Sequence, residues 1–175
     1  MKVEIGCGAR PTPGYFHTDI TPQPGVELDY RGPAWSVPVA CGTADEVLAL
    51  GCIEHLSQTD AIATFVNVHR MLKPGGVFLF DVPDLVAWCN YLVELELGHP
   101  VPFEREHILA TLYGWQRWPG DEHRYGWTDH ALLAALEEAG FSTVTWGLEP
   151  FLARGIVRRR FGRIEDAHIY TQAAA

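Results

Sequence analysis

The stretch that decides the fold is Val3-Glu4-Ile5-Gly6-Cys7-Gly8, near the start of the 175-residue chain. A short apolar run that enters Gly-x-Gly is typical of the first strand of a parallel α/β sheet, where the following turn exposes backbone to a ligand. A side chain at Gly6 or Gly8 would block close approach, and a residue without a Cβ also accepts the positive φ of a tight turn. The sequence therefore predicts a ligand crevice directly after the first strand.

These glycines do not fit a dinucleotide site. That fingerprint needs a third glycine and a helix start to hold the pyrophosphate, with an acidic residue about 20 positions later. Here the segment 9–14 contains two prolines, which disfavour a helix and remove amide donors. The first acidic residue after this loop is Asp19, too close for a full crossover helix. A nucleotide-binding oxidoreductase is therefore disfavoured.

Turn signals divide the rest of the chain into alternating strands and helices. One helix, with its N-cap at Ser57 or Thr59, is expected to end before Pro74-Gly75-Gly76. Another is expected to begin after Thr128 and to end at Gly140. The strands expected after the second one span residues 26–29, 44–50, 77–82, 141–146 and 167–171.

Residues 85–125 are predicted to be an insertion. An amphipathic segment over 85–97 precedes an aromatic-rich stretch that includes Tyr113, Trp115 and Trp118. These aromatic side chains either pack in the core or form an apolar wall over a bound molecule. We expect a single domain, residues 1–175, with the insertion as a cap.

The composition is that of a globular domain, with 47% hydrophobic and 20% charged residues. The four cysteines form no C-x-x-C pair, which disfavours a zinc site or a disulfide framework and favours a cytoplasmic location. No apolar run is long enough to span a membrane. The net charge of −9 disfavours nucleic acid as a partner. Five arginines nevertheless gather in one stretch, which fits a solvated loop, an anion site or, weakly, RNA: Arg154, Arg158, Arg159, Arg160 and Arg163.

Four motifs occur in an order that resembles small class I S-adenosylmethionine-dependent methyltransferases of the methyltransferase type 11 kind. They are Glu4 to Gly8, Gly14 to Ile20, Glu54-His55-Leu56 and Leu72 to Gly76. The resemblance implies an α/β fold: a doubly wound, Rossmann-like sheet of about seven strands in the order 3-2-1-4-5-7-6, with the last strand antiparallel. The chain departs from longer members of the family because it has little room for N-terminal helices, so we expect these to be reduced.

The resemblance also implies that S-adenosylmethionine is the cofactor and S-adenosylhomocysteine its product. The Gly-x-Gly turn would line the methionine part, Asp19 would accept hydrogen bonds from the ribose hydroxyls, and Asp29 with Tyr30 would flank the adenine. Glu4 would help to bind the ammonium group, directly or through water. The residues expected to contact the cofactor are Glu4, Gly6, Cys7, Gly8, Asp19, Ile20, Asp29, Tyr30, Leu50 and Gly51.

Transfer from a sulfonium is an in-line displacement, which needs alignment and, for a hydroxyl acceptor, removal of a proton, but no metal. His55 and His123 are the candidate bases, because a neutral imidazole accepts a proton near pH 7. Both have a structural alternative, as residues that hold a loop or the cap. Asp81, Asp84 and Tyr125 are the candidate substrate residues.

The function expected from this resemblance is methyl transfer to a small-molecule acceptor, such as a sugar, a metabolite or a natural-product intermediate. The alternative is a non-catalytic scaffold or a subunit that depends on a partner, and an RNA acceptor is less favoured. We expect no membrane partner. The aromatic residues of the insertion are compatible with a homodimer.

Overall fold

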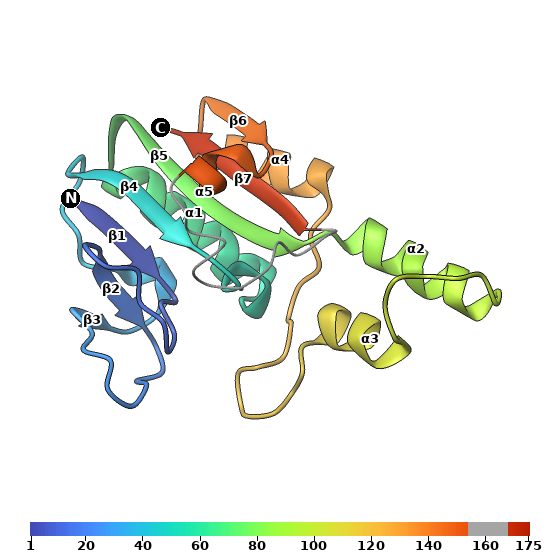
Figure 1. The fold of residues 1–175 in the computed structure, drawn as a ribbon. Coiled ribbons are helices and arrows are strands. Elements are labelled where there is room, and N and C mark those ends of the chain that lie inside the picture. Colours follow the sequence, from blue (N-terminus) through green and yellow to red (C-terminus); the bar gives the residue numbers. More distant parts are fainter. Residues whose placement is uncertain (154–167) are drawn as a thin grey trace.

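The computed structural model describes residues 1–153 and 168–175, which contain a seven-stranded sheet with helices around it (Figure 1). The strand order is β3-β2-β1-β4-β5-β7-β6, and β7 runs antiparallel to both of its neighbours. The fold class and strand order predicted from the sequence are confirmed. The strands are β1 (Lys2–Ile5), β2 (Phe16–Asp19), β3 (Tyr30–Arg31), β4 (Ala44–Ala49), β5 (Leu72–Pro83), β6 (Thr143–Trp146) and β7 (His168–Ala174).

Helices cover the sheet unequally. The larger core lies between one face of the sheet and the helices α1 and α4, and the smaller core includes Phe151 of α5. Alternation along β4 separates the two cores, because Val47 and Ala49 belong to the larger one while Leu48 and Leu50 belong to the smaller. The helices are η1 (Ala34–Ser36), η2 (Ile53–His55), α1 (Gln58–Met71), α2 (Leu85–Glu96), α3 (Arg105–Tyr113), α4 (Asp129–Glu138) and α5 (Glu149–Ala153).

The helices α1 and α4 begin at the caps that the sequence predicts. The Ser57 hydroxyl accepts a hydrogen bond from the backbone N–H of Asp60, and the Thr128 hydroxyl accepts one from Ala131. The α1 helix ends at Met71, and β5 begins at the next residue, five residues before the predicted strand. Here Leu72 already pairs with Ala44, so the sheet extends past the Pro-Gly-Gly turn.

The third strand is not where the sequence predicts it. Residues 26–29 were expected to form it, but β3 contains only Tyr30 and Arg31. The backbone N–H of Val26 bonds to the carbonyl of Gln23 within a turn, which keeps this segment out of the ladder. Pairing with β2 begins only at Tyr30, opposite Thr18.

The N-terminal helices are reduced, as predicted. Residues 6–15, all of which the structure describes, join β1 to β2 without a helix, and only the short η1 precedes β4. Two parallel neighbours are thus connected by a loop of ten residues, where a crossover helix is usual. The edge of the sheet that carries the β1–β2 loop therefore depends on loop contacts for its shape.

The segment after β5 carries α2 and α3, which extend beyond the carboxyl ends of the strands (Figure 1). The segment 85–97, predicted to be amphipathic, forms α2, whereas α3 was not predicted. Trp88 of α2 is fully buried and lies 4.7 Å from the ring of Phe103 and 5.6 Å from that of His107, measured between centroids. This part of the chain therefore has its own aromatic cluster. In the part of the chain that the structure describes, no helix is both long and apolar enough to cross a membrane.

Candidate active site

The turns after β1 and β4 meet at the point where the strand order reverses. Gly6, Gly8 and Gly51 have φ values of +65°, +57° and +55°. A Cβ on Gly6 would lie 2.6 Å from the sulfur of Cys52, so the two turns are packed against each other. Such a switch point, outside the carboxyl ends of parallel strands, is where α/β sheets bind ligands. Backbone from both turns therefore meets at the place where the sequence predicts the crevice.

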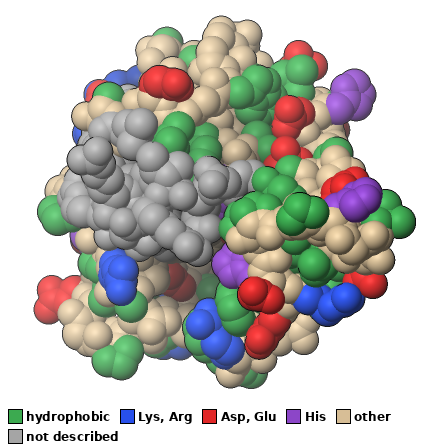
Figure 2. Space-filling model, turned by 45° about the vertical axis from the view of Figure 1, so that its right-hand side comes forward, with side chains coloured by type: hydrophobic (Ala, Val, Ile, Leu, Met, Phe, Trp, Pro, Cys, Tyr) green, Lys and Arg blue, Asp and Glu red, His purple; other side chains and the backbone are tan. Residues whose placement is uncertain are grey.

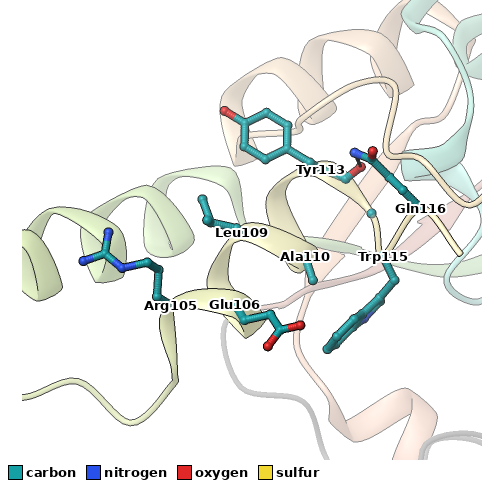
Figure 3. Close-up of a pocket in the computed structure, with 8 residues that line it drawn as sticks. Arg105, Glu106, Leu109, Ala110, Tyr113, Trp115 and Gln116 are labelled. Carbon is teal, nitrogen blue, oxygen red and sulfur yellow. Dashed lines mark hydrogen bonds between the residues drawn. The ribbon is translucent and has the colours of Figure 1, made fainter.

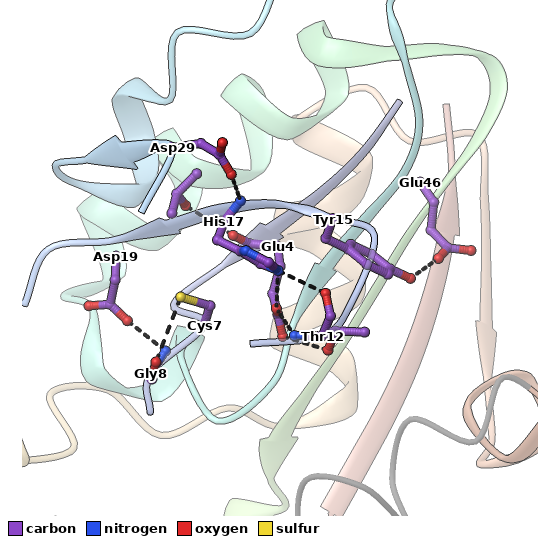
Figure 4. A network of polar contacts seen from close by, with 10 residues as sticks. Glu4, Cys7, Gly8, Thr12, Tyr15, His17, Asp19, Asp29 and Glu46 are labelled. Atoms are coloured by element: carbon purple, nitrogen blue, oxygen red, sulfur yellow. Dashed lines mark hydrogen bonds and ion pairs between the residues drawn. The ribbon is translucent and has the colours of Figure 1, made fainter. Parts of the chain in front are cut away.

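Asp19, at the end of β2, is held beside the first turn (Figure 4). One carboxylate oxygen accepts a hydrogen bond from the backbone N–H of Gly8, 2.8 Å away, and the other accepts one from Thr21 at the same distance. Each oxygen keeps a second lone pair, so the carboxylate can accept further hydrogen bonds from a ligand. Of the two apolar neighbours expected at the cofactor, Cys7 is fully buried and Ile20 is 62% exposed.

Glu4 lies inside the sheet rather than at its edge. Its fully buried carboxylate accepts hydrogen bonds from the backbone N–H of Thr12, at 2.6 Å, and from the Thr12 hydroxyl, at 2.9 Å. The ring of His17 lies on the same network, 3.8 Å from a Glu4 oxygen (Figure 4). Glu4 thus holds the 9–14 loop against β1. Direct contact between Glu4 and a cofactor, as expected from the sequence, would require this loop to move.

The two residues expected at the adenine lie along the β2–β3 edge. The Asp29 carboxylate accepts a hydrogen bond from the backbone N–H of His17, at 2.7 Å. The Tyr30 hydroxyl lies 3.1 Å from the hydroxyl of Ser36. Asp29 is the last residue of the loop and Tyr30 the first residue of β3, and each side chain contacts a neighbouring segment.

Asp81 is buried beneath the second turn, although the sequence analysis places it among the substrate residues. One of its oxygens accepts a hydrogen bond from the backbone N–H of Gly51, at 2.9 Å, and the other lies 3.1 Å from Nδ1 of His168. The side chain of Asp81 is fully buried. Its position suits a residue that fixes the Gly51 turn from below rather than one that touches an acceptor. His168 was not predicted as part of the site.

Asp84 and Tyr125 lie at the two ends of the segment predicted to be a cap. One Asp84 oxygen accepts hydrogen bonds from the backbone N–H groups of Val86 and Ala87, which makes Asp84 the N-cap of α2. The Tyr125 ring packs edge-on against Trp127, with centroids 4.7 Å apart. The structure therefore gives the Asp84 carboxylate a capping role.

Glu54, His55 and His123 come together next to the Gly51 turn. The rings of His55 and His123 are 4.8 Å apart between centroids and nearly perpendicular. The three side chains each offer a ligand atom, and these atoms all lie within 4.8 Å of one another. The backbone links the same segments, because the carbonyl of Glu54 accepts a hydrogen bond from the N–H of Arg124 at 2.8 Å. The structure thus unites the two histidines that the sequence analysis nominates separately, and adds Glu54.

Burial shifts the pKa values of Glu54 and His123 in opposite directions. It raises the pKa of Glu54, with a smaller opposing effect from His55 and a further increase from Asp81. Burial also lowers the pKa of His123 to about 4, to which His55 adds, so His123 is neutral at pH 7. Strongly perturbed groups that share a cluster beside a crevice are typical of functional sites.

A surface pocket of about 430 Å³ lies on the outer side of the cap (Figure 3). It is lined by α3 and the residues that follow it: Arg105, Glu106, Leu109, Ala110, Tyr113, Gly114, Trp115 and Gln116. Tyr113 and Trp115 are 60% and 46% exposed, so they are not core residues. Figure 2 shows hydrophobic side chains gathered among acidic and basic ones on this side of the molecule. The arginine-rich stretch from Arg154 to Arg163 falls outside the described residues, and its anion site stays a prediction.

Comparison with known families decides the identity of this fold. Residues 3–145 match the model of a family described as a methyltransferase domain. The chain belongs to that family. It is a class I S-adenosylmethionine-dependent methyltransferase, as the motifs and the strand order predict. No curated protein matches its sequence.

Solved structures share the methyltransferase fold at low sequence identity. A Thermotoga maritima S-adenosylmethionine-dependent methyltransferase, described as a possible histamine N-methyltransferase, is 15% identical, with a TM-score of 0.60, over 99% of this chain and 81% of that one. A Haloferax volcanii methyltransferase, crystallised with the Trm112 activator, is 16% identical, with a TM-score of 0.56, over 99% and 81%. The 1,6-didemethyltoxoflavin-N1-methyltransferase of Burkholderia thailandensis, with its substrate and S-adenosylhomocysteine bound, is 16% identical, with a TM-score of 0.57, over 99% and 69%.

Proposed function

We propose that this methyltransferase binds S-adenosylmethionine between the Gly6–Gly8 and Gly51 turns and transfers its methyl group to a small-molecule acceptor. The observation that carries the proposal is the junction of these turns with Asp19 at the switch point of the sheet. Bare backbone on both sides suits the amino acid part of the cofactor, which carries both charge signs, while the Asp19 carboxylate suits the ribose hydroxyls. Asp29 and Tyr30 are the proposed neighbours of the adenine.

The acceptor is proposed to lie between the donor crevice and the cap. Glu54 is adjacent to the Gly51 turn, and a Cβ on Gly51 would lie 3.8 Å from a Glu54 oxygen. The cluster with His55 and His123 therefore stands beside the place where the methyl group would be delivered. A neutral imidazole there can take the proton from an acceptor hydroxyl during the displacement. Tyr125 and the aromatic residues of the cap supply apolar surface for a small molecule.

A small-molecule acceptor is favoured over RNA by charge. The net charge of −9 gives no broad attraction to phosphate. The four cysteines form no C-x-x-C pair, which supports the proposal that the chain acts in the cytoplasm. Exposed Tyr113, Trp115 and Trp118 support either acceptor contact or a homodimer, and sedimentation of the purified chain distinguishes the two.

The test is calorimetric titration with S-adenosylmethionine and S-adenosylhomocysteine, run on the wild type, Asp19→Ala and Asp45→Ala. Asp45 is the matched control, since it is exposed at the start of β4 and pairs with the N-terminal amine and Lys73. We expect micromolar binding that Asp19→Ala loses and Asp45→Ala keeps. Failure of the folded wild-type chain to bind either compound would reject the donor site.

Turnover is tested separately from binding. We expect His123→Gln to bind S-adenosylhomocysteine like the wild type. In the presence of an accepted substrate, it should form S-adenosylhomocysteine from S-adenosylmethionine more slowly. A panel of hydroxyl- and amine-bearing small molecules, scored by product formation, identifies that substrate. If His123→Gln turned over at the wild-type rate, the histidine cluster would have no part in the reaction.

A further inference from the structure

The cluster of Glu54, His55 and His123 has the features of a metal site. Because methyl transfer needs no metal, none is expected from the sequence, and the three residues were considered only as bases or loop contacts. We propose that they bind one divalent transition-metal ion, with zinc as the ion to test. The three ligand atoms would come from η2 and from the segment before α4, two parts of the chain that are 67 or more residues apart.

Both imidazoles are held in the form that a metal requires. Nδ1 of His123 lies 2.7 Å from the carbonyl of Thr111, and Nδ1 of His55 lies 3.1 Å from that of Glu122. A carbonyl only accepts hydrogen bonds, so each Nδ1 donates its proton to one, and Nε2 is the nitrogen left to face a metal. This pairing of Nδ1–H with a backbone carbonyl orients most histidines that bind metals through Nε2.

Glu54 supplies an unsatisfied buried carboxyl oxygen. Its side chain is only 5% exposed, and its Oε2 has no hydrogen-bond partner among the residues that the structure describes. A buried carboxylate without a partner is costly, because it has lost its water and gained nothing in return. A cation bound by Glu54 and the two imidazoles would satisfy the free oxygen. This orphaned oxygen is the second, independent sign that something binds here.

The space and the ligand set also fit. Glu54 and His123, though not His55, line a narrow hollow of about 10 Å³, room for roughly one water-sized particle. Zinc bonds are about 2.1 Å long, so ligand atoms that now lie within 4.8 Å of one another need to close by about 1 Å. Two histidines and one glutamate are a set found in zinc sites that keep an open position. That open position would face a water or an oxygen of the acceptor.

A metal here would deepen the proposed function without depending on it. With the ion in place, the imidazoles act as ligands rather than as bases, and a hydroxyl bound to the ion would lose its proton more readily. The site can be measured with the metal alone, whether or not the chain turns over an acceptor.

The experiment uses the full chain without an affinity tag, stripped with a chelator and then titrated with zinc chloride in a calorimeter. Bound metal is counted by mass spectrometry after dialysis. We expect one zinc per wild-type chain, and a loss of affinity of about tenfold or more in both Glu54→Gln and His123→Gln. His99→Gln is the matched control, because His99 is an exposed histidine that also pairs with a glutamate, Glu94. It is expected to bind zinc like the wild type.

Three results would overturn the proposal. These are no zinc on the wild-type chain, zinc affinity as high as that of the wild type in Glu54→Gln and His123→Gln, or a thiolate charge-transfer band on the cobalt-loaded chain, which would place the metal on a cysteine. Circular dichroism confirms that each variant is folded. S-adenosylhomocysteine is titrated into the same samples, so loss of the donor site and loss of the metal site are observed independently.

Discussion

Glu54 is proposed to bind a metal, and its buried carboxyl lowers the stability of the metal-free fold. Its carboxylate is buried, its pKa is raised by that burial, and one of its oxygens is unpaired among the described residues. A group whose folded pKa is raised stabilises the fold below its unfolded pKa, and this contribution is lost as the pH rises through the folded value. Glu54 therefore lowers the free energy of unfolding of the metal-free protein at neutral pH.

Replacing that carboxylate is expected to stabilise the metal-free chain. In the presence of a chelator at pH 7, Glu54→Gln should raise the thermal midpoint by about 3 °C, because the amide carries no charge to bury. Well below the ordinary glutamate pKa of about 4.3, the wild-type carboxyl is protonated in both states, so the difference should disappear. Differential scanning calorimetry at the two pH values measures both. A variant less stable than the wild type at pH 7 would contradict this account of the burial.

At the scale of elements, the first turn depends on close packing as well as on backbone conformation. Gly6 and Gly14 lie at the two ends of the β1–β2 loop and both have positive φ, at +65° and +85°. They differ in what surrounds them. A Cβ on Gly6 would collide with Cys52, whereas one on Gly14 would have nothing within 4 Å.

Alanine at these two positions separates backbone strain from packing. Gly14→Ala should cost about 1–2 kcal/mol, from the left-handed conformation alone. Gly6→Ala should cost a further 1–3 kcal/mol or so, because the β1 and β4 turns must separate. Gly6→Ala should also weaken the binding of S-adenosylhomocysteine, while Gly14→Ala should leave this binding nearly unchanged. Denaturation in urea and calorimetry measure the two effects, and equal costs would show that Cys52 yields freely.

The elements also show what the sequence could predict. Strands and helices with strong signals, such as the Gly-x-Gly turn and the Ser57 and Thr128 caps, lie where expected, and the strand order follows from the motifs. The two-residue β3 and the α3 helix were missed because neither has a strong periodic pattern. Asp81 was placed on the substrate side because it ends an apolar strand. Its partner His168 belongs to β7, and only the antiparallel register of β5 and β7 brings the two together.

At the scale of the whole molecule, the ring of Phe65 connects the sheet with α1 and with the segment that returns from the cap. Phe65 of α1 is fully buried and lies 5.6 Å from Phe80 and 5.8 Å from Trp127, measured between ring centroids. Phe80 belongs to β5, and Trp127 closes the segment that returns from the cap. The helix α1, the sheet and the base of the cap therefore share one core.

Truncation of this ring should destabilise the entire fold. Phe65→Ala is expected to cost about 3–5 kcal/mol, because it leaves a cavity between rigid neighbours. The matched control is Val66→Ala, since Val66 is the next residue and is 50% exposed; it should cost less than about 0.5 kcal/mol. Urea denaturation measures both. Similar values for the two variants would mean that α1 does not hold this core together.

The position of β7 has a consequence for how the protein is made. This strand lies between β5 and β6 in the sheet, yet it follows both of them in the chain. Until residues 168–174 have left the ribosome, β5 and β6 each present an open edge to other nascent chains, and Asp81 has no His168 to face. The growing chain of this enzyme therefore passes through an interval with two unpaired strand edges, and a chaperone that shields such edges would act on it at that moment.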